Sequence, residues 1–573
     1  MNLLKKRGTI GLALLVALSL IAAACGGEDE EETATTEAAA VTTTAAAPET
    51  TAAPADDDMA DDDMADDDMA DDDMADDDMA DDDMMEEDPD GPKRGGDLIF
   101  ARHRDNTTLD PGAAVETDTI YVLDHIFETL FATSADGASV DPWLASDYEV
   151  SDDGKSWTVT LREGVVFSNG QPMTSADVKF SIQRAIDEAA FGFLLSAIES
   201  IETPDDMTVV FNTSFPWAPF LADLSVWAAA IMPADYAGMS AEEFFENPIG
   251  TGPFLFDEWV PGEYIRLVRN DNYWQEGKPY VDSVTWTQVP DDNTRILQLE
   301  GGQAHIAQNV PLNLLDSLNE KEGITATTFP ATTVYWVSFN TTIEPFNDRH
   351  VRRAIAHAID QDAISNAALF GHGGPACSVI SPAVPFHDPD TPCLESNMDL
   401  ARAELAQSSV PDGFSAEYLV GDQSPNLPIV EIIQGQLAPL GIDISIRTID
   451  PGQFYSTIFV FDYEIAFTGW TMDIPDPDQK ISFMFDPELG GGDSYSTGYN
   501  NPEMIELVRA GQTTFADADR AQIYADIQAL NAEEVPFIPL VVLDAPFAWS
   551  DSVKGLWVNP VGKRHLEDVW LDE

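Results

Sequence analysis

Apolar and polar residues alternate along several short stretches of the chain, with the period of two that is typical of β-strands. This pattern predicts strands at residues 97–100, 157–161, 442–447 and 463–468. The last of these reads as a half-buried strand that ends at Gly469, where a loop begins.

Other segments repeat apolar residues every three or four positions, which predicts amphipathic helices at 119–130 and 429–440. The second ends at Gly441, because glycine is the common residue just beyond a helix. Asn347 or Asp348 caps a further helix, whose apolar stripe consists of Val351, Ala354, Ile355, Ala358 and Ile359. Helices that lead directly into strands indicate an α/β fold.

The chain begins with a targeting pattern. An apolar run from about Ile10 to Ala24 follows three basic residues and is short for a membrane span, so residues 1–24 are predicted to be a secretory signal. The small residues before Cys25 resemble a bacterial lipobox, which predicts a lipid-anchored Cys25 on the outer face of the bacterial cytoplasmic membrane. An ordinary signal with an incidental cysteine is the alternative.

Residues 25–90 have the composition of a disordered linker. Beyond Gly27 this segment holds no lysine or arginine, and the unit Ala-Asp-Asp-Asp-Met repeats through residues 55–84. Like charges repel and no aromatic residue is present to form a core, so we expect an extended, solvated tether. The repeat lacks the glycine and terminal glutamate of a calcium loop, and a specific metal site is not expected there.

The net charge limits the possible partners of the folded part, and two of the cysteines are expected to pair. The chain has 103 acidic and 27 basic residues, and residues 91–573 still carry 74 acidic against 24 basic residues, a formal charge of −50. This charge argues against nucleic acid or anionic lipid as a partner of the folded part. Outside the cytoplasm, Cys377 and Cys393 are expected to form a disulfide.

The loop after the strand at 463–468 is a candidate binding site. It contains three aspartates, two prolines and Trp470. A carboxylate beside an aromatic face suits a ligand with a cationic end and hydrogen-bonding groups, such as a peptide. A plain turn is the alternative, and Asp476 and Asp478, which lie beside prolines, are assigned to the turn.

Enzyme motifs are incomplete. Gly154-Lys155-Ser156 ends like a phosphate-binding loop, but Glu149 stands where the first glycine is needed. His350 and His357 are spaced for one helix face but lack a third metal ligand at helical spacing. We therefore expect no enzyme activity, no cofactor and no metal site.

Several motifs occur in an order that resembles the family 5 solute-binding proteins of ABC importers, the dipeptide- and oligopeptide-binding class. They are LDP at 109–111, PWLASDYEVSDDGKSWTVTLREGVVF at 142–167, NGQPMTSADVKFSIQR at 169–184, GTGPF at 250–254, RNDNYW at 269–274, KPY at 278–280, VPD at 289–291, FN at 339–340, PFND at 345–348 and VRRA at 351–354. The resemblance covers nearly all of residues 95–560.

The resemblance implies a two-lobed periplasmic-binding-protein-like α/β fold that closes on a ligand between its lobes. Lobe I would span residues 91–340, with an extra subdomain at about 141–245. Lobe II would span 341–540, and residues 541–573 would return to lobe I.

The same resemblance implies roles for residues of the loop that follows the strand at 463–468. Peptide-binding members use a Gly-Trp-x-x-Asp loop for backbone hydrogen bonds and for the ligand's α-amino group, which assigns Gly469, Trp470, Thr471 and Asp473 to ligand binding. The basic residue for the ligand carboxylate is not located. We expect a monomer that delivers a peptide to a membrane permease. A non-peptide solute (a nickel chelate, sugar or opine-like compound) or a tethered hydrolase or adhesin are the alternatives.

Overall fold

The computed structural model describes residues 91–422, 425–489 and 493–572. The expectations for the signal segment, Cys25 and the acidic repeat concern residues outside these ranges. In the described part, no helix has the length and apolar character needed to cross a membrane.

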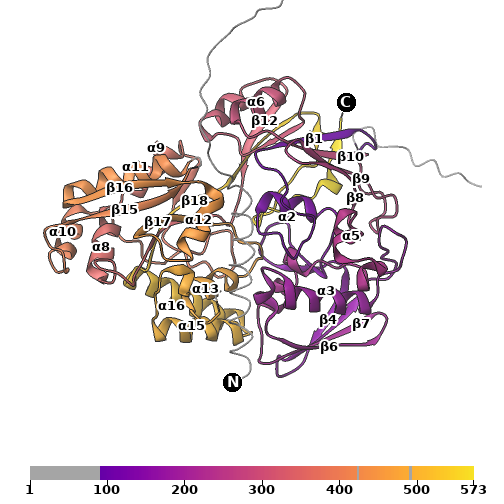
Figure 1. The fold of residues 1–573 in the computed structure, drawn as a ribbon, viewed down its shortest axis with the longest axis horizontal. Coiled ribbons are helices and arrows are strands. Elements are labelled where there is room, and N and C mark those ends of the chain that lie inside the picture. Colours follow the sequence, from indigo (N-terminus) through magenta and orange to yellow (C-terminus); the bar gives the residue numbers. More distant parts are fainter. Residues whose placement is uncertain (1–90, 423–424, 490–492, 573) are drawn as a thin grey trace, which may run out of the picture. The chain divides into compact units, whose positions relative to one another are not determined.

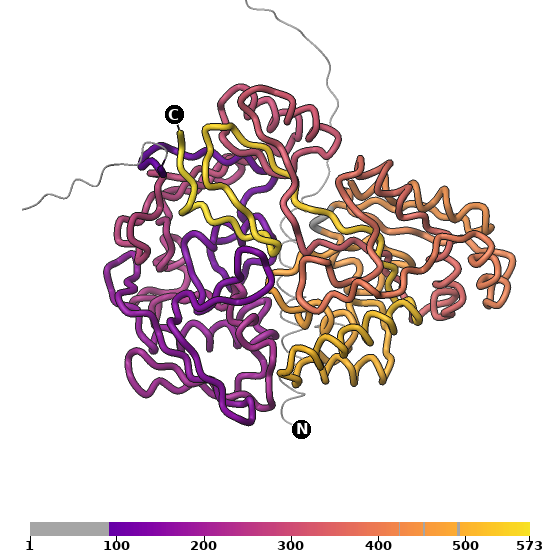
Figure 2. The backbone as a smooth tube through the Cα atoms, turned by 180° about the vertical axis from the view of Figure 1, so that it is seen from behind, coloured from indigo at the N-terminus to yellow at the C-terminus, as the bar shows by residue number. Residues whose placement is uncertain are grey.

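One large sheet joins the beginning of the described chain to its end. Its strands are, in spatial order, β12 (Ile324–Phe329), β19 (Ala545–Ser550), β11 (Ile306–Gln308), β1 (Asp97–Arg102), β10 (Ser283–Gln288), β9 (Tyr264–Arg269) and β8 (Phe254–Val260). β1 is parallel to both β10 and β11, whereas β19 is antiparallel to β11 and β12. Figure 2 shows the yellow C-terminal segment returning to the part that contains the indigo N-terminal strand.

Smaller sheets surround this one. An antiparallel sheet has the order β4 (Ala145–Val150), β5 (Ser156–Leu161), β7 (Thr208–Thr213) and β6 (Ile198–Asp205). Two hairpin-like pairs add β2 (Phe131–Thr133) with β3 (Val140–Pro142) and β20 (Val553–Lys554) with β21 (Trp570–Leu571). The helices in this half are α2 (Thr117–Leu123), α3 (Ser175–Glu188), α4 (Phe220–Asp223), α5 (Ala241–Glu246), α6 (Asp292–Glu300) and α7 (Leu315–Asn319).

A second large sheet lies in the middle of the sequence. Its order is β14 (Gly373–Pro375), β18 (Phe537–Leu543), β13 (Val334–Phe339), β17 (Ile465–Trp470), β15 (Phe414–Gly421) and β16 (Ile442–Ile449). Its helices are α8 (Arg349–Ala358), α9 (Gln361–Ala368), α10 (Met398–Leu405), α11 (Asn426–Leu437), α12 (Pro451–Ile458), α13 (Asp478–Phe485), α14 (Asp493–Ser496), α15 (Pro502–Thr513) and α16 (Asp517–Glu534).

Helices cover both faces of this second sheet. One buried cluster joins its strands to α8, α9, α10 and α11, and another joins them to α13, α15 and α16 (Figure 1). We call the residues of the second sheet and its helices, 334–543, lobe II, and the residues on either side, 91–329 and 545–572, lobe I. The chain therefore enters the second sheet at Val334, earlier than the boundary expected at residue 340, because β13 pairs with β17 and β18.

Two elements differ from the sequence-based expectation. β17 begins at Ile465 and is buried from there to Thr468, because it is an inner strand covered on both faces; such strands lose the alternation of a half-buried strand. α2 is shorter than the helix expected at 119–130. The carbonyls of His125 and Ile126 instead accept hydrogen bonds from Phe254 and Gly252.

Candidate functional site

Gly469 lies where β17 passes the ring of Tyr335 on the neighbouring strand. A Cβ atom at residue 469 would stand 2.5 Å from that ring, so no larger residue fits without a shift of the ring. Tyr335 also stacks on Phe467, with 5.3 Å between ring centroids. This close contact between β17 and β13 within lobe II explains the glycine.

The edge of β17 near its end is open on one side. Among the described residues, β13 pairs with β17 from Ile465 to Trp470, but β15 pairs with it only at Ile465 and Ala466. The backbone from Phe467 to Trp470 is therefore free of a strand partner on the β15 side. Such an edge can accept an extended peptide as an additional strand.

The loop after β17 is fixed by the segment that leads from lobe I into β13. The backbone N–H of Met472 donates to the Thr332 hydroxyl at 2.7 Å, and that hydroxyl lies 3.1 Å from the Met472 carbonyl. The hydroxyl groups of Thr333 and Thr471 are 2.7 Å apart. Thr471 therefore has an internal partner, and its side chain contributes to the shape of the loop.

Asp473 is half-buried and is held by one glutamine at two points. Its backbone N–H donates to Oε1 of Gln479 at 2.9 Å, and Nε2 of Gln479 donates to its Oδ2 at 2.8 Å. Burial raises the pKa of the Asp473 carboxyl to about 7, while hydrogen bonds from Gln479 and Trp470 act in the opposite direction. When burial raises the pKa of a carboxyl group, a nearby cation stabilises its ionised form strongly, because little water is left to solvate the charge.

Aromatic side chains extend away from Trp470 along lobe II. Trp470 stacks on Tyr495 with ring centroids 6.2 Å apart, and Tyr495 meets Phe459 edge-on at 6.4 Å. Phe459 stacks on Tyr455 at 6.1 Å. Tyr455 and Phe459 are each 47% exposed, which is unusual for large aromatic residues in contact with one another. This row offers stacking surfaces to a ligand.

Lobe I residues lie opposite this loop. Asp124 raises and Lys563 lowers the pKa of Asp473, so both lie within electrostatic reach of its carboxyl. Lys563 donates to the Ser225 carbonyl at 3.2 Å and is 3.8 Å from Asp124, and Arg564 lies 3.6 Å above the Tyr121 ring. These basic residues were not predicted from the sequence, although Lys563-Arg564-His565 is a basic run in an acidic chain.

The two lobes also contact each other directly. The Ala218 N–H donates to the Gln512 carbonyl at 2.8 Å. The ring centroids of Phe193 and Phe483 are 6.0 Å apart. Trp157 stacks on Phe515, with 6.1 Å between their ring centroids. A cavity of about 50 Å³ in lobe I is lined in part by Asp124, Lys563 and Arg564. Since one water needs about 10–15 Å³, this cavity has room for a few waters and not for a peptide.

Asp476 and Asp478, which the sequence assigned to a turn, are buried structural residues. Asp476 receives two hydrogen bonds from Arg520, at 2.7 and 3.0 Å. Asp478 is 1% exposed and accepts a hydrogen bond from Gln512 at 3.3 Å. Both side chains therefore hold the loop against α15 and α16 in addition to shaping the turn.

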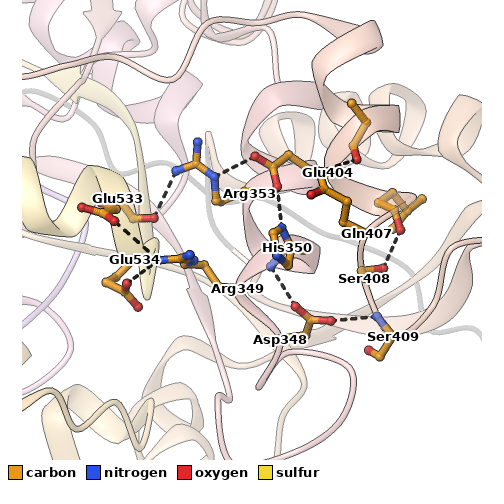
Figure 3. Close-up of polar contacts among 12 residues, drawn as sticks. Asp348, Arg349, His350, Arg353, Glu404, Gln407, Ser408, Ser409, Glu533 and Glu534 are labelled. Atoms are coloured by element: carbon orange, nitrogen blue, oxygen red, sulfur yellow. Dashed lines mark hydrogen bonds and ion pairs between the residues drawn. The ribbon is translucent and has the colours of Figure 1, made fainter.

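The two histidines weighed as metal ligands have separate partners. His350 contacts Glu404 at 2.7 Å within a network that includes Arg353 and Asp348 (Figure 3). His357 contacts the Glu395 carbonyl at 2.8 Å. Cys377 and Cys393 are joined by a disulfide, with 4.7 Å between their Cα atoms.

Comparison with known proteins agrees with this architecture. Residues 139–491 match the family of bacterial extracellular solute-binding proteins, family 5. The glutathione-binding protein GsiB of Salmonella paratyphi A is 29% identical over 485 residues, 83% of this chain and 94% of the relative.

Two solved structures are similar as well. DppA of Helicobacter pylori, in complex with the peptide STSA, is 27% identical with a TM-score of 0.76, over 84% of this chain and 99% of that one. AgaA of A. tumefaciens R10, in complex with agropinic acid, is 29% identical with a TM-score of 0.74, over 83% of this chain and 99% of that one. The family match extends across most of each lobe, and both lobes have mixed α/β structure. The chain therefore belongs to family 5 of the bacterial extracellular solute-binding proteins.

Proposed function

We propose that this protein captures peptides with a free amino terminus between its two lobes and delivers them to a membrane permease. Proteins of its family are the extracytoplasmic binding components of ABC importers and are not enzymes.

The observation that supports it is the open edge of β17 next to the Asp473 carboxyl. Extended backbone can pair with residues 467–470, which would hold peptides of many sequences, and Asp473 can hold the α-ammonium group. In this proposal Gly469, Trp470 and Asp473 contact the ligand, and Thr471 orients the loop.

Two relatives bind ligands that fit this chemistry. GsiB is named for glutathione and DppA was solved with a peptide, and both ligands carry a free amino group. AgaA was solved with agropinic acid, so a non-peptide solute is the second candidate. The two candidates differ in whether blocking an amino group abolishes binding.

The proposed location is the outer face of the bacterial cytoplasmic membrane. Cys25 would carry the lipid, and residues 26–90 would form the acidic tether that lets the monomeric body reach its permease. In this arrangement residues 91–329 and 545–572 form lobe I and residues 334–543 form lobe II.

Mass spectrometry of the ligand retained by the protein purified from its host tests this assignment. We expect short peptides with unblocked amino termini. The matched control is the Asp473→Asn variant purified in the same way, which should retain less. Retention of a compound without an amino group, in equal amount by both proteins, would favour a non-peptide solute.

A further inference from the structure

The row of aromatic side chains that begins at Trp470 ends in two exposed rings on α12. Trp470 stacks on the buried Tyr495, and Tyr495 meets Phe459 edge-on, with 6.4 Å between the last two ring centroids. Tyr455 and Phe459 are four residues apart, so they share one face of the helix, and their rings stack at 6.1 Å. Each is 47% exposed. Adjoining exposed aromatic residues of this size indicate a binding surface.

α12 borders the open edge of β17. β15 stops pairing with β17 after Leu419. α12 packs at the last residue of β15, since a Cβ atom on Gly421 would lie 4.0 Å from the Phe454 ring. The Tyr455 phenol lies within electrostatic reach of Tyr335 on β13, the strand on the other side of β17. The exposed rings therefore flank the stretch where β17, among the described residues, has no partner on the β15 side.

The aromatic row also lies on the wall of lobe II that faces lobe I. The ring of Phe483 is 5.3 Å from the Trp470 ring and 6.0 Å from the Phe193 ring of lobe I, between centroids. Burial raises the pKa of the Tyr455 phenol, and Arg104 of lobe I acts in the opposite direction. Both ends of the row thus have neighbours in lobe I, as expected for the wall of an interlobe site.

A peptide paired with β17 can reach the exposed rings within a few residues. An extended chain advances about 3.3 Å per residue. The ring of Phe459 is two centroid steps, of 6.2 and 6.4 Å, from the ring of Trp470. With the peptide's amino group at Asp473 and its first residues beside Trp470, the third or fourth residue comes level with Phe459.

We propose that Tyr455 and Phe459 form a subsite for an aromatic side chain, which makes this protein select peptides with phenylalanine, tyrosine or tryptophan at the third or fourth residue. The inference rests on the proposed function, because pairing with β17 is what carries the side chain to the subsite. Tyr495 supports Phe459 from the buried side, so the subsite exists before the ligand arrives.

The chemistry of the two rings favours an aromatic partner. A third ring can lie flat or edge-on against them, and such contacts add to the free energy gained from burying apolar surface. A cationic side chain can also lie over an aromatic face. Arg104 already acts on Tyr455, however, and would repel a second cation there.

Calorimetry with tetraalanine and its single-substitution versions tests the subsite. The probes carry one phenylalanine at each of the four positions in turn, or one lysine at position three or four. We expect phenylalanine at position three or four to tighten binding to the wild type by about tenfold or more relative to tetraalanine, and lysine to give no such gain.

The gain should depend on the exposed rings of α12. In Phe459→Ala, the ratio between the affinities for the phenylalanine peptide and for tetraalanine should fall below about threefold. Phe370→Ala is the matched control, because Phe370 is also an exposed phenylalanine of lobe II, at 56%, and this variant should keep the full ratio. Should Phe459→Ala not fold, Phe459→Leu replaces it, since leucine keeps an apolar side chain without the ring.

The outcomes separate the subsite from the peptide site. If tetraalanine binds but phenylalanine gives no gain at position three or four, or the gain persists in the Phe459 variants, the subsite is wrong and the peptide site stands. An equal gain with lysine would overturn the aromatic class of side chain. If neither tetraalanine nor the phenylalanine peptides bind, the proposed function fails and the subsite with it.

Discussion

The ion pair between Asp476 and Arg520 is expected to be a main support of lobe II. Arg520 donates to both carboxylate oxygens of Asp476 and, through Nε, to the Gly511 carbonyl at 2.8 Å. Its guanidinium lies 5.0 Å from the Phe386 ring and 5.4 Å from the Tyr524 ring. The side chains of Arg520 and Asp476 are 6% and 8% exposed, so water cannot replace a lost partner.

The Asp476→Asn substitution keeps the shape of the side chain and removes its charge. Arg520 would then be a buried cation without a carboxylate in contact, and breaking one side of such a pair costs about 3–5 kcal/mol. Asp473→Asn, three residues earlier, is the matched control. Because burial raises the pKa of Asp473, its ionised form is disfavoured in the fold, and its removal should not lower the free energy of unfolding.

Urea unfolding followed by tryptophan fluorescence and circular dichroism measures both effects, provided that the two signals change together. We expect Asp476→Asn to lower the free energy of unfolding by about 3–5 kcal/mol and Asp473→Asn to leave it unchanged or higher. A loss below about 1 kcal/mol for Asp476→Asn would refute the reasoning, since it would place the pair among weak surface ion pairs.

Three further predictions concern other parts of the chain. Burial, with the nearby charge of Asp476, raises the pKa of Asp478 from 3.8 to about 7, so the native state holds a proton that the unfolded state has lost. Stability should thus fall as pH rises from 3.8 to about 7, and urea titrations of Asp478→Asn should show a smaller fall. Deleting residues 55–84 should change ligand affinity in calorimetry by less than about tenfold, because a disordered spacer forms no binding wall. Cys25→Ala should release the protein from washed membranes; a mature variant still bound there, cut before residue 25, would contradict lipid anchoring.

Much of the fold is visible in the sequence because local patterns and tertiary packing agree there. The stripe after Asp348 becomes α8, whose N-terminus Asp348 caps, and Gly441 adopts the left-handed conformation that ends a helix. The boundary of β17 was less accurate, because a strand buried on both faces carries no alternation. The end of α2 depended on backbone pairing with residues far along the chain, which no local pattern reports.

The candidate site was predictable only in part. The Gly-Trp-x-x-Asp motif pointed to the loop, but the role of Gly469 follows from Tyr335, which lies more than a hundred residues earlier. The aromatic row could not be read from the sequence, since it joins Trp470 to Tyr495 and Phe459, which lie in separate segments. The pattern of residues along the sequence does not report which distant segments lie close together in the fold.

The central claim, that Asp473 holds the amino terminus of a peptide, is tested most directly by calorimetry with a free-amine peptide and its N-acetylated form. Loss of one partner of a desolvated charge pair costs about 2–5 kcal/mol, so Asp473→Asn should weaken binding of the free peptide by at least about thirtyfold. Asp399→Asn, whose side chain is 96% exposed, should bind as the wild type does. The acetylated peptide should bind the wild type poorly and distinguish little between the proteins. If Asp473→Asn instead binds the free-amine peptide as tightly as the wild type, the anchor lies elsewhere and the claim is contradicted.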